Sequence, residues 1–345
     1  MSGRSKAAGG RRITMAEIAA SADVSVPTVS KVLNGRVDVA AETRQRVEDA
    51  LVVSGYPRGK RRLAEAPRVL ELVFTEFGPY ASEIIRGASE TALARGGRVT
   101  VNALSDEKSE RAWIDHLERG GADGVILAMA DLAESTSLRL RNLATPVVVV
   151  DPVGDPPPSI NSVGVTNWIG GMRAAEHLIE LGHRRIGLVG GRTRKLCNQA
   201  RLDGYRAALE HAGLPIDPAL IAVDNPDHAS ALAAASDMLK RPDAPTAIVA
   251  TSDLHAMGVY EAARLRGLRL PDDLSVIGFD DIPMAAWASP PLTTMRQPLA
   301  EIAALAVRML LEPHTASFTH RMELATTLVV RASTSRPAAR KRSRP

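Results

Sequence analysis

Polar residues follow apolar runs at three places in the chain, and their types define the chemistry available there. Asp151 comes directly after PVVVV, Ser252 and Asp253 follow AIVAT, and Asp280 and Asp281 follow VIGF. Carboxylate and hydroxyl oxygens accept hydrogen bonds from the hydroxyl groups of a ligand. Each aspartate could equally cap a helix that begins after its strand.

Arg201 and two aromatic residues complete a set that suits a sugar. Arg201 lies in RLDGY on a predicted helix, and Tyr80 and Trp168 lie near strand–helix junctions. An arginine donates to hydroxyl groups, and aromatic rings cover the apolar face of a sugar. We therefore predict a sugar-binding set of Tyr80, Asp151, Trp168, Arg201, Ser252 and Asp280.

The sequence lacks the patterns typical of enzymes and metal proteins. It contains no G-x-S-x-G, no Ser, His and Asp in a catalytic order, and no pair of histidines with metal-ligand spacing. LVGG at 188–191 has the spacing of neither a Walker nor a dinucleotide loop, so it indicates a tight turn at a strand end. We expect no catalytic residue, no metal ion and no cofactor.

Alternating strands and helices must position the sugar-binding set. Continuous apolar runs such as VLELVF and GVILA are typical of buried parallel strands, and amphipathic helices lie between them. The alternation restarts near residue 166, which predicts an α/β body of two doubly wound parallel-sheet lobes. Ligands of such folds bind at the carboxyl ends of the strands, here in the cleft between the lobes.

A separate all-α pattern precedes the body. Thr14 and Glu17 form a T-x-x-E capping box, and Ser25 can cap a helix over 26–33 whose first turn contains Pro27. NG ends that helix, and AETRQRVEDALVV predicts a third one. The side chains expected to face inward are Ile18, Ala19, Val29, Val32, Leu33, Val47, Leu51 and Val52. Two short helices joined by a tight turn and braced by a third form a helix-turn-helix domain.

The second helix of a helix-turn-helix domain enters the major groove of DNA by its N-terminus. Val26 and Pro27 lie at that tip without a side-chain donor, so they would read bases by apolar contact, for example with thymine methyl groups. Polar neighbours such as Lys31 would hold phosphates or bases. The DNA contacts predicted in this way are Thr14, Met15, Val26, Pro27, Thr28, Ser30, Lys31 and Asn34. A three-helix domain that binds protein is the alternative.

The charge distribution agrees with a polyanionic partner for the head. The first 68 residues carry 13 basic and 7 acidic residues. Residues 336–345 carry five basic and no acidic residues, and we expect this tail to be disordered.

Cysteine content and hydropathy exclude two further features. The single cysteine, Cys197, excludes a disulfide within the chain. The sequence contains no run of about 18 apolar residues, so no membrane span is predicted. No secretory signal is recognisable, so we expect a cytoplasmic protein.

The stretch ITMAEIAASADVSVPTVSKVLNGRVDVAAETRQRVEDALVVSGY closely resembles the DNA-binding head of the LacI/GalR family of bacterial transcription regulators. LGHRRIGLVGG, RLDGYRAAL, PDDLSVIGFDD and PPLTTMRQP resemble the family's effector domain, which has a periplasmic-binding-protein-like fold. The chain resembles actinobacterial members more than the lactose repressor, which favours a plant-derived oligosaccharide as effector. The resemblance implies a repressor that binds a pseudo-palindromic operator as a homodimer and is controlled by a sugar.

The resemblance also assigns roles to single residues. It places Val26 and Pro27 at the two operator-discriminating positions. Further positions that contact DNA in the family are Thr14, Ser25, Thr28, Ser30, Lys31, Asn34 and Tyr56. The effector-binding positions are Asp151, Arg201, Ser252 and Asp280, with Tyr80 and Trp168 in segments that line the cleft. The family's commonest residue at position 252 is asparagine, from which Ser252 departs.

The linker PRGKRRLAEAPR departs from the family pattern. In the family this segment orders into a hinge helix on DNA and inserts a leucine into the minor groove, whereas this chain has Gly59 and a cluster of basic residues. We predict a segment that folds on DNA, with Arg61 and Arg62 in the minor groove and Leu63 as the wedge. A plain flexible linker is the alternative.

The predicted organisation follows from these patterns. It comprises a basic tail (1–11), a helix-turn-helix domain (12–56), a linker (57–68), an effector and dimerisation domain (69–335) and a basic tail (336–345). Within the effector domain, the first lobe consists of 69–165 and 296–322, and the second lobe consists of 166–295 and 323–335. Segments near 165–167, 294–297 and 321–325 would be hinges.

The sequence also leaves alternatives to a sugar-controlled regulator. Arg192, Arg194 and Lys195 keep open a regulator that responds to a phosphorylated sugar, or in the same class to a nucleobase. A transport-type sugar-binding protein would need a secretion signal, and an enzyme would need a catalytic constellation.

Overall fold

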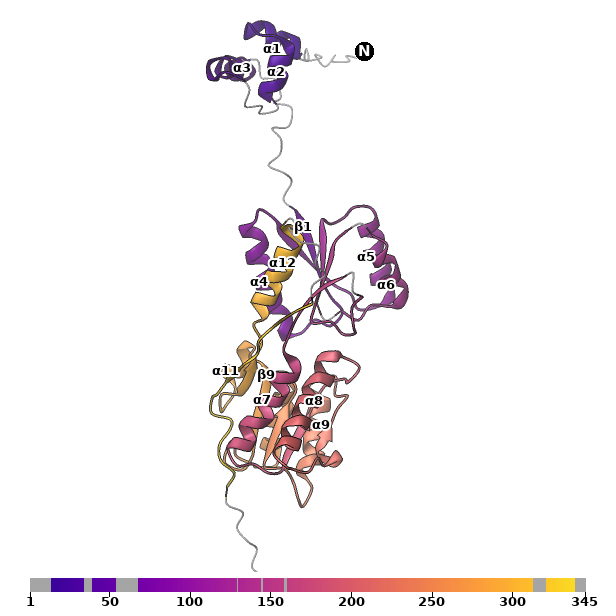
Figure 1. The fold of residues 1–345 in the computed structure, drawn as a ribbon, viewed down its shortest axis with the longest axis vertical. Coiled ribbons are helices and arrows are strands. Elements are labelled where there is room, and N and C mark those ends of the chain that lie inside the picture. Colours follow the sequence, from indigo (N-terminus) through magenta and orange to yellow (C-terminus); the bar gives the residue numbers. More distant parts are fainter. Residues whose placement is uncertain are drawn as a thin grey trace, which may run out of the picture. The chain divides into compact units, whose positions relative to one another are not determined.

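The computed structural model describes residues 14–33, 39–53, 68–128, 130–143, 145–157, 160–312 and 321–338, and the chain separates into two units, 1–67 and 68–345. The predicted fold class is confirmed: the first unit contains a small helical head, and the second is an α/β body with two parallel-dominated sheets (Figure 1). None of the helices among the described residues is long and apolar enough to cross a membrane.

The head begins with the capping box that the sequence predicts. The backbone N–H of Thr14 donates to Glu17 Oε2 at 2.8 Å, and Thr14 Oγ1 accepts from the N–H of Glu17 at 3.4 Å. Ser25 Oγ accepts from the N–H of Thr28 at 3.3 Å, so it caps the second helix. The three helices are α1 (Met15–Ser21), α2 (Val26–Leu33) and α3 (Ala41–Val53).

One side chain from each helix forms the centre of the head. Ile18, Val29 and Val47 have no exposed surface, and they belong to three different helices. The predicted inward residues Ala19, Val32 and Leu51 are also buried, whereas the side chains of Leu33 and Val52 lie outside the described residues. This small core is what holds the three helices together.

The first lobe of the body is a six-stranded parallel sheet between two layers of helices. Its strands run in the order β2 (Arg98–Ala103), β1 (Val69–Phe74), β3 (Gly124–Ala128), β4 (Val147–Val150), β5 (Asn161–Val165) and β11 (Arg321–Leu324). Its helices are α4 (Pro79–Ala94) and α12 (Leu299–Leu311) on one face, and α5 (Glu107–Glu118) and α6 (Glu134–Arg141) on the other. All residues of β3 are buried, as expected for a parallel strand covered on both faces.

The second lobe repeats this plan with one antiparallel edge strand. Its strands run in the order β7 (Ile221–Ala222), β6 (Ile186–Val189), β8 (Ala247–Ala250), β9 (Ser275–Asp280), β10 (Thr293–Arg296) and the antiparallel β12 (Thr327–Val329). Its α-helices are α7 (Asn167–Glu180), α8 (Leu196–His211), α9 (His228–Leu239), α10 (Asp253–Leu265) and α11 (Pro283–Trp287), and a 3-10 helix covers Pro218–Leu220.

The chain passes between the lobes three times. It crosses between β5 and α7, returns between β10 and α12, and crosses again between β11 and β12. Because the strands of both sheets except β12 are parallel, their carboxyl ends face the space between the lobes.

Candidate functional site

A cavity of about 170 Å³ lies between the two lobes of the body. Residues from both lobes line it, and most of them come from segments that follow strands, where parallel-sheet folds bind ligands. Its polar lining side chains are Glu76, Tyr80, Asp151, Arg192, Lys195, Asn198, Arg201, Asn225, Ser252, His255, Asp280 and Gln297. Phe74, Leu254 and Ile282 supply apolar surface.

The structure brings five of the six predicted sugar-binding residues to this cavity and places Trp168 elsewhere. Tyr80, Asp151, Arg201, Ser252 and Asp280 line the cavity. Trp168 lines a neighbouring cavity of about 370 Å³ that Asp151 also borders, and 42% of its surface is exposed. Successive residues of a helix point in different directions. Asn167, which precedes Trp168 in α7, is the residue that contacts Arg201.

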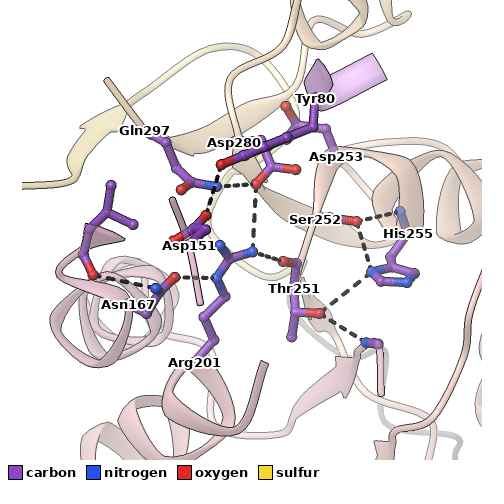
Figure 2. A network of polar contacts seen from close by, with 12 residues as sticks. Tyr80, Asp151, Asn167, Arg201, Thr251, Ser252, Asp253, His255, Asp280 and Gln297 are labelled. Atoms are coloured by element: carbon purple, nitrogen blue, oxygen red, sulfur yellow. Dashed lines mark hydrogen bonds and ion pairs between the residues drawn. The ribbon is translucent and has the colours of Figure 1, made fainter. Parts of the chain in front are cut away.

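Arg201 is the centre of the polar network in this cavity (Figure 2). Its Nε donates to Asn167 Oδ1 at 2.8 Å, and its Nη1 donates to the carbonyl oxygen of Thr251 at 2.6 Å and lies 3.5 Å from Asp280 Oδ1. The guanidinium also lies 3.7 Å above the ring of Phe279. With 5% of its surface exposed, Arg201 is a buried cation whose orientation is fixed from several sides.

Two of the carboxyl groups predicted at strand ends, Asp151 and Asp280, share the cavity with Arg201. Burial raises the pKa of Asp280 to about 6, although Arg201 opposes the shift. Burial likewise raises the pKa of Asp151. Both residues have a positive φ, +117° at Asp280 and +49° at Asp151. Such strained backbone conformations are enriched at functional sites.

The other two predicted strand-end aspartates, Asp253 and Asp281, do not line the cavity. Asp253 accepts from Thr294 Oγ1 at 2.6 Å and from the N–H of Ile282 at 3.0 Å, with no exposed surface. Asp281 pairs with Arg296 and Arg331, each at 2.6 Å. Their role in the structure is to connect strands and loops of the second lobe.

The carboxylates of Asp151 and Asp280, which line the cavity, accept hydrogen bonds from neighbouring side chains and keep further lone pairs. Tyr80 Oη donates to Asp151 Oδ2 at 3.0 Å, and Gln297 Nε2 donates to Asp280 Oδ1 at 2.6 Å. Gln297 Oε1 is buried without a partner among the described residues.

Three cations of the segment 192–195 are paired with acids of the first lobe; Arg192 and Lys195 line the cavity, and Arg194 lines another one nearby. Lys195 Nζ lies 2.6 Å from Glu76 Oε2, and Arg192 Nη1 lies 3.8 Å from Glu76 Oε1. Arg194 forms an ion pair with Asp131. These contacts join the lobes, and the two carboxylates offset most of the positive charge that a phosphate would require.

Sequence reasoning missed several residues of the site. Glu76 and Asp131 lie just after β1 and β3, so the strand-end rule that found Asp151 could have found them. Gln297 follows β10 in the same way. The spacing of His255 could have indicated that it contacts Ser252, because it lies three residues later at the start of a helix.

In the head, the predicted DNA contacts at the start of α2 form an exposed group. Ser25, Val26, Pro27 and Lys31 are exposed, and 40% of the surface of Val26 is accessible. Thr14 and Met15 are exposed as well, and Thr28 and Ser30 are partly buried. The remaining predicted contacts lie outside the described residues: Asn34, Tyr56, Arg61, Arg62 and Leu63.

Substituting Asp280 by asparagine is expected to remove a pH dependence that the wild-type carboxyl creates. Its folded pKa of about 6 exceeds the ordinary 3.8, so the folded state binds this proton more tightly than the unfolded state does. The contribution of Asp280 to the free energy of unfolding therefore falls by up to about 3 kcal/mol as pH rises from the lower to the higher of these pKa values. Above the folded pKa it stays constant.

Urea unfolding between about pH 4 and pH 8 measures this effect as the difference in unfolding free energy between D280N and the wild type. As pH rises, we expect the unfolding free energy of D280N to increase relative to that of the wild type. The difference should become constant above the folded pKa of Asp280. Asp203 of α8, whose side chain is half-exposed, provides the control variant D203N, which removes a carboxyl group that does not line the cavity. A D280N difference that does not change with pH would contradict the assigned shift.

Comparison with known proteins gives consistent matches for both units. Residues 14–58 match the model of bacterial regulatory proteins of the lacI family, and residues 175–334 match the periplasmic binding protein-like domain. The HTH-type transcriptional repressor CytR of Escherichia coli (strain K12) is 33% identical over 330 residues, which cover 93% of this chain and 96% of that protein. The HTH-type transcriptional regulator CelR of Thermobifida fusca is 32% identical over 341 residues, covering 94% and 98%. A solved transcriptional regulator CelR–cellobiose complex has a TM-score of 0.72 and 30% sequence identity, covering 93% of this chain and 100% of that chain.

Proposed function

This chain belongs to the lacI family of bacterial regulatory proteins, and from that premise we propose that a neutral sugar or oligosaccharide in its cleft controls the binding of its head to operator DNA. The observation that carries the proposal is the acceptor-rich cavity around Arg201, Asp151 and Asp280. Such a wall suits a ligand that presents many hydroxyl donors and no net charge. The complex of the similar regulator CelR with cellobiose supports this ligand class.

The cations near the cavity favour a neutral effector over a phosphorylated one. Arg192, Arg194 and Lys195 are already paired with Glu76 and Asp131, so a phosphate would have to displace these acids. It would also approach the buried carboxylates of the cleft, which repel an anion.

The control of DNA binding would follow from the arrangement of the body. The ligand contacts both lobes, and three crossings connect them, so its binding can favour one relative position of the lobes over another. We propose that the chain acts in the cytoplasm as a repressor and as a homodimer. Two heads are needed because one recognition helix covers only one half of a pseudo-palindromic operator. The proposal assigns no catalytic step to the cleft.

A ligand panel tests the proposed effector class. The full chain is heated with glucose, ribose, cellobiose, glucose 6-phosphate or adenine, and a compound that binds the folded state must raise its melting temperature. We expect a neutral sugar to do so and then to change the affinity for an operator fragment selected from a DNA pool. A shift produced only by the phosphorylated sugar or by adenine would overturn the assignment of a neutral effector.

A further inference from the structure

His255 and Ser252 form a hydrogen-bonded pair at the wall of the cavity. Ser252 is the N-cap of α10, and its Oγ accepts from the N–H of His255 at 3.2 Å. The side chains also meet, with His255 Nδ1 2.8 Å from Ser252 Oγ. The other ring nitrogen, Nε2, lies 2.9 Å from the carbonyl oxygen of Asn225 (Figure 2 shows Ser252 and His255 beside Thr251). Both nitrogens of this buried ring are therefore engaged.

The partners of the ring determine where its proton lies. A backbone carbonyl oxygen can only accept a hydrogen bond, so Nε2 of His255 must carry hydrogen to donate to Asn225. In a neutral imidazole the other nitrogen, Nδ1, is then an acceptor. Burial lowers the pKa of His255, which keeps the ring neutral near neutral pH. Consequently the hydroxyl of Ser252 must be the donor in the contact with Nδ1.

This bond consumes the only proton that Ser252 has. A serine hydroxyl contains one donor and two acceptor lone pairs. The donor goes to His255 Nδ1, and one lone pair accepts from the backbone N–H of His255. What Ser252 can still offer to the cavity is the second lone pair. A serine without this histidine could rotate its hydroxyl and either donate to a ligand or accept from it.

Thr251 does not supply the missing donor, because it is not among the residues that line the cavity. Its Oγ1 accepts from the N–H of Gly191 at 3.1 Å and lies 3.5 Å from the same His255 Nδ1. Its carbonyl oxygen is occupied by Arg201 at 2.6 Å. At Ser252 the end of β8 therefore offers the cavity an acceptor, as the carboxylate of Asp280 does.

We propose that His255 is a specificity-determining positioning residue: by binding the hydroxyl proton of Ser252 it makes position 252 an acceptor, which selects a ligand with a hydroxyl or amine donor there. This inference rests on the proposed function for the identity of the site, but the state of the pair is a property of the protein alone. A ligand group that only accepts, such as a fluorine or an ether oxygen, would be rejected at that position.

Nitrogen NMR of the full chain tests the pair without any ligand. The eight histidines carry an isotope label in their rings, and the resonance of His255 is the one absent from His255→Asn. Near neutral pH we expect the neutral form protonated at Nε2, with an Nδ1 resonance that shifts in Ser252→Ala because its hydrogen bond is lost. A ring protonated at Nδ1, or an Nδ1 resonance that does not respond to Ser252→Ala, would overturn the proposal.

A double-mutant cycle tests the consequence for recognition, with cellobiose and its monodeoxyfluoro analogues as probes. Removing one neutral hydrogen bond should weaken binding roughly 3- to 10-fold. We expect one fluorine position to cause this loss in the wild type and no loss in Ser252→Ala, and His255→Leu to have no further effect in the Ser252→Ala background. His255→Asn, whose amide oxygen can accept from Ser252, should retain part of the preference.

Two outcomes separate this inference from the proposed function. If cellobiose does not bind, the proposed effector class is weakened, while the NMR result still decides the inference about His255. If cellobiose binds and all fluorinated analogues lose affinity equally in the wild type and in Ser252→Ala, the inference is wrong although the effector class stands. The melting temperatures of all variants show that each one is folded.

Discussion

Substitution of Arg201 by methionine is expected to leave a regulator that remains on its operator when the effector is added. The guanidinium is the buried cation that faces Asp280 and Asp151, and it donates to Asn167 and Thr251. Hydrogen bonds to a charged group contribute about 1.5–3 kcal/mol, so effector affinity should fall roughly 10- to 100-fold. DNA binding itself should persist, because the head is a separate unit.

The same substitution is also expected to reduce the stability of the body. Removing one partner of a buried ion pair leaves the other charge uncompensated and costs about 3–5 kcal/mol. Protonation of Asp280, whose pKa is already raised to about 6, would reduce that loss at lower pH. The variant Arg201→Lys keeps the charge but loses the planar fork, so it should be more stable than Arg201→Met and still bind effector poorly.

The measurement combines thermal unfolding with operator binding in the presence and absence of effector. Arg206→Met is a matched control, because Arg206 lies on the same helix as Arg201 and pairs only with Asp203 at the surface among the contacts described. This control should respond to effector like the wild type. If Arg201→Met were released from the operator at the wild-type effector concentration, Arg201 would have no role in recognition.

The strand-end residues explain how far the site could be predicted from the sequence. Apolar runs locate the ends of parallel strands, and any polar residue there is directed to the same edge of the sheet, as Asp151 and Asp280 are. The rule cannot tell which way a side chain turns after that point. Asp253 and Asp281 also follow strands, but their partners Thr294 and Arg331 come from other elements and hold them away from the cavity.

The parts that could not be predicted depend on contacts between distant segments. The sequence predicts Trp168 in the cleft because it is an aromatic residue near a strand–helix junction and lies in a segment that lines the cleft in the family. The start of α7 instead directs Asn167 toward Arg201 and Trp168 toward the neighbouring cavity. Lys195, taken by itself, indicates a phosphate site. Its partner Glu76 lies in the other lobe, and the sequence alone does not reveal that this pair forms. The role of His255 depends on the carbonyl of Asn225, which no pattern in the sequence reveals.

The head was predictable in greater detail because its determinants are local. The capping box of Thr14 and Glu17 and the cap at Ser25 each involve residues three apart, and both are confirmed. The helical period also placed Ile18 and Val29 in the core. Roles of single residues in DNA binding remain proposals that depend on this core.

Substitution of Ile18 by alanine is expected to abolish operator binding without changing effector binding. Ile18 has no exposed surface, and truncating a buried isoleucine costs about 2–5 kcal/mol. A helical unit of this size has a total stability of only about 3–5 kcal/mol, so much of the variant head would be unfolded. Operator affinity should therefore fall at least about tenfold, because the exposed tip of α2 is presented only by a folded head.

The reciprocal variant Ile84→Ala makes the test specific to the head. Ile84 of α4 is equally buried, but it lies in the core of the first lobe. It should lower the melting temperature of the body and leave the folding of the head unchanged, whereas Ile18→Ala should leave the body transition and the effector-induced stabilisation as in the wild type. If Ile18→Ala also lost effector stabilisation, the two units would depend on one another for folding. If it bound the operator with wild-type affinity, operator binding would not depend on the packed core of the head.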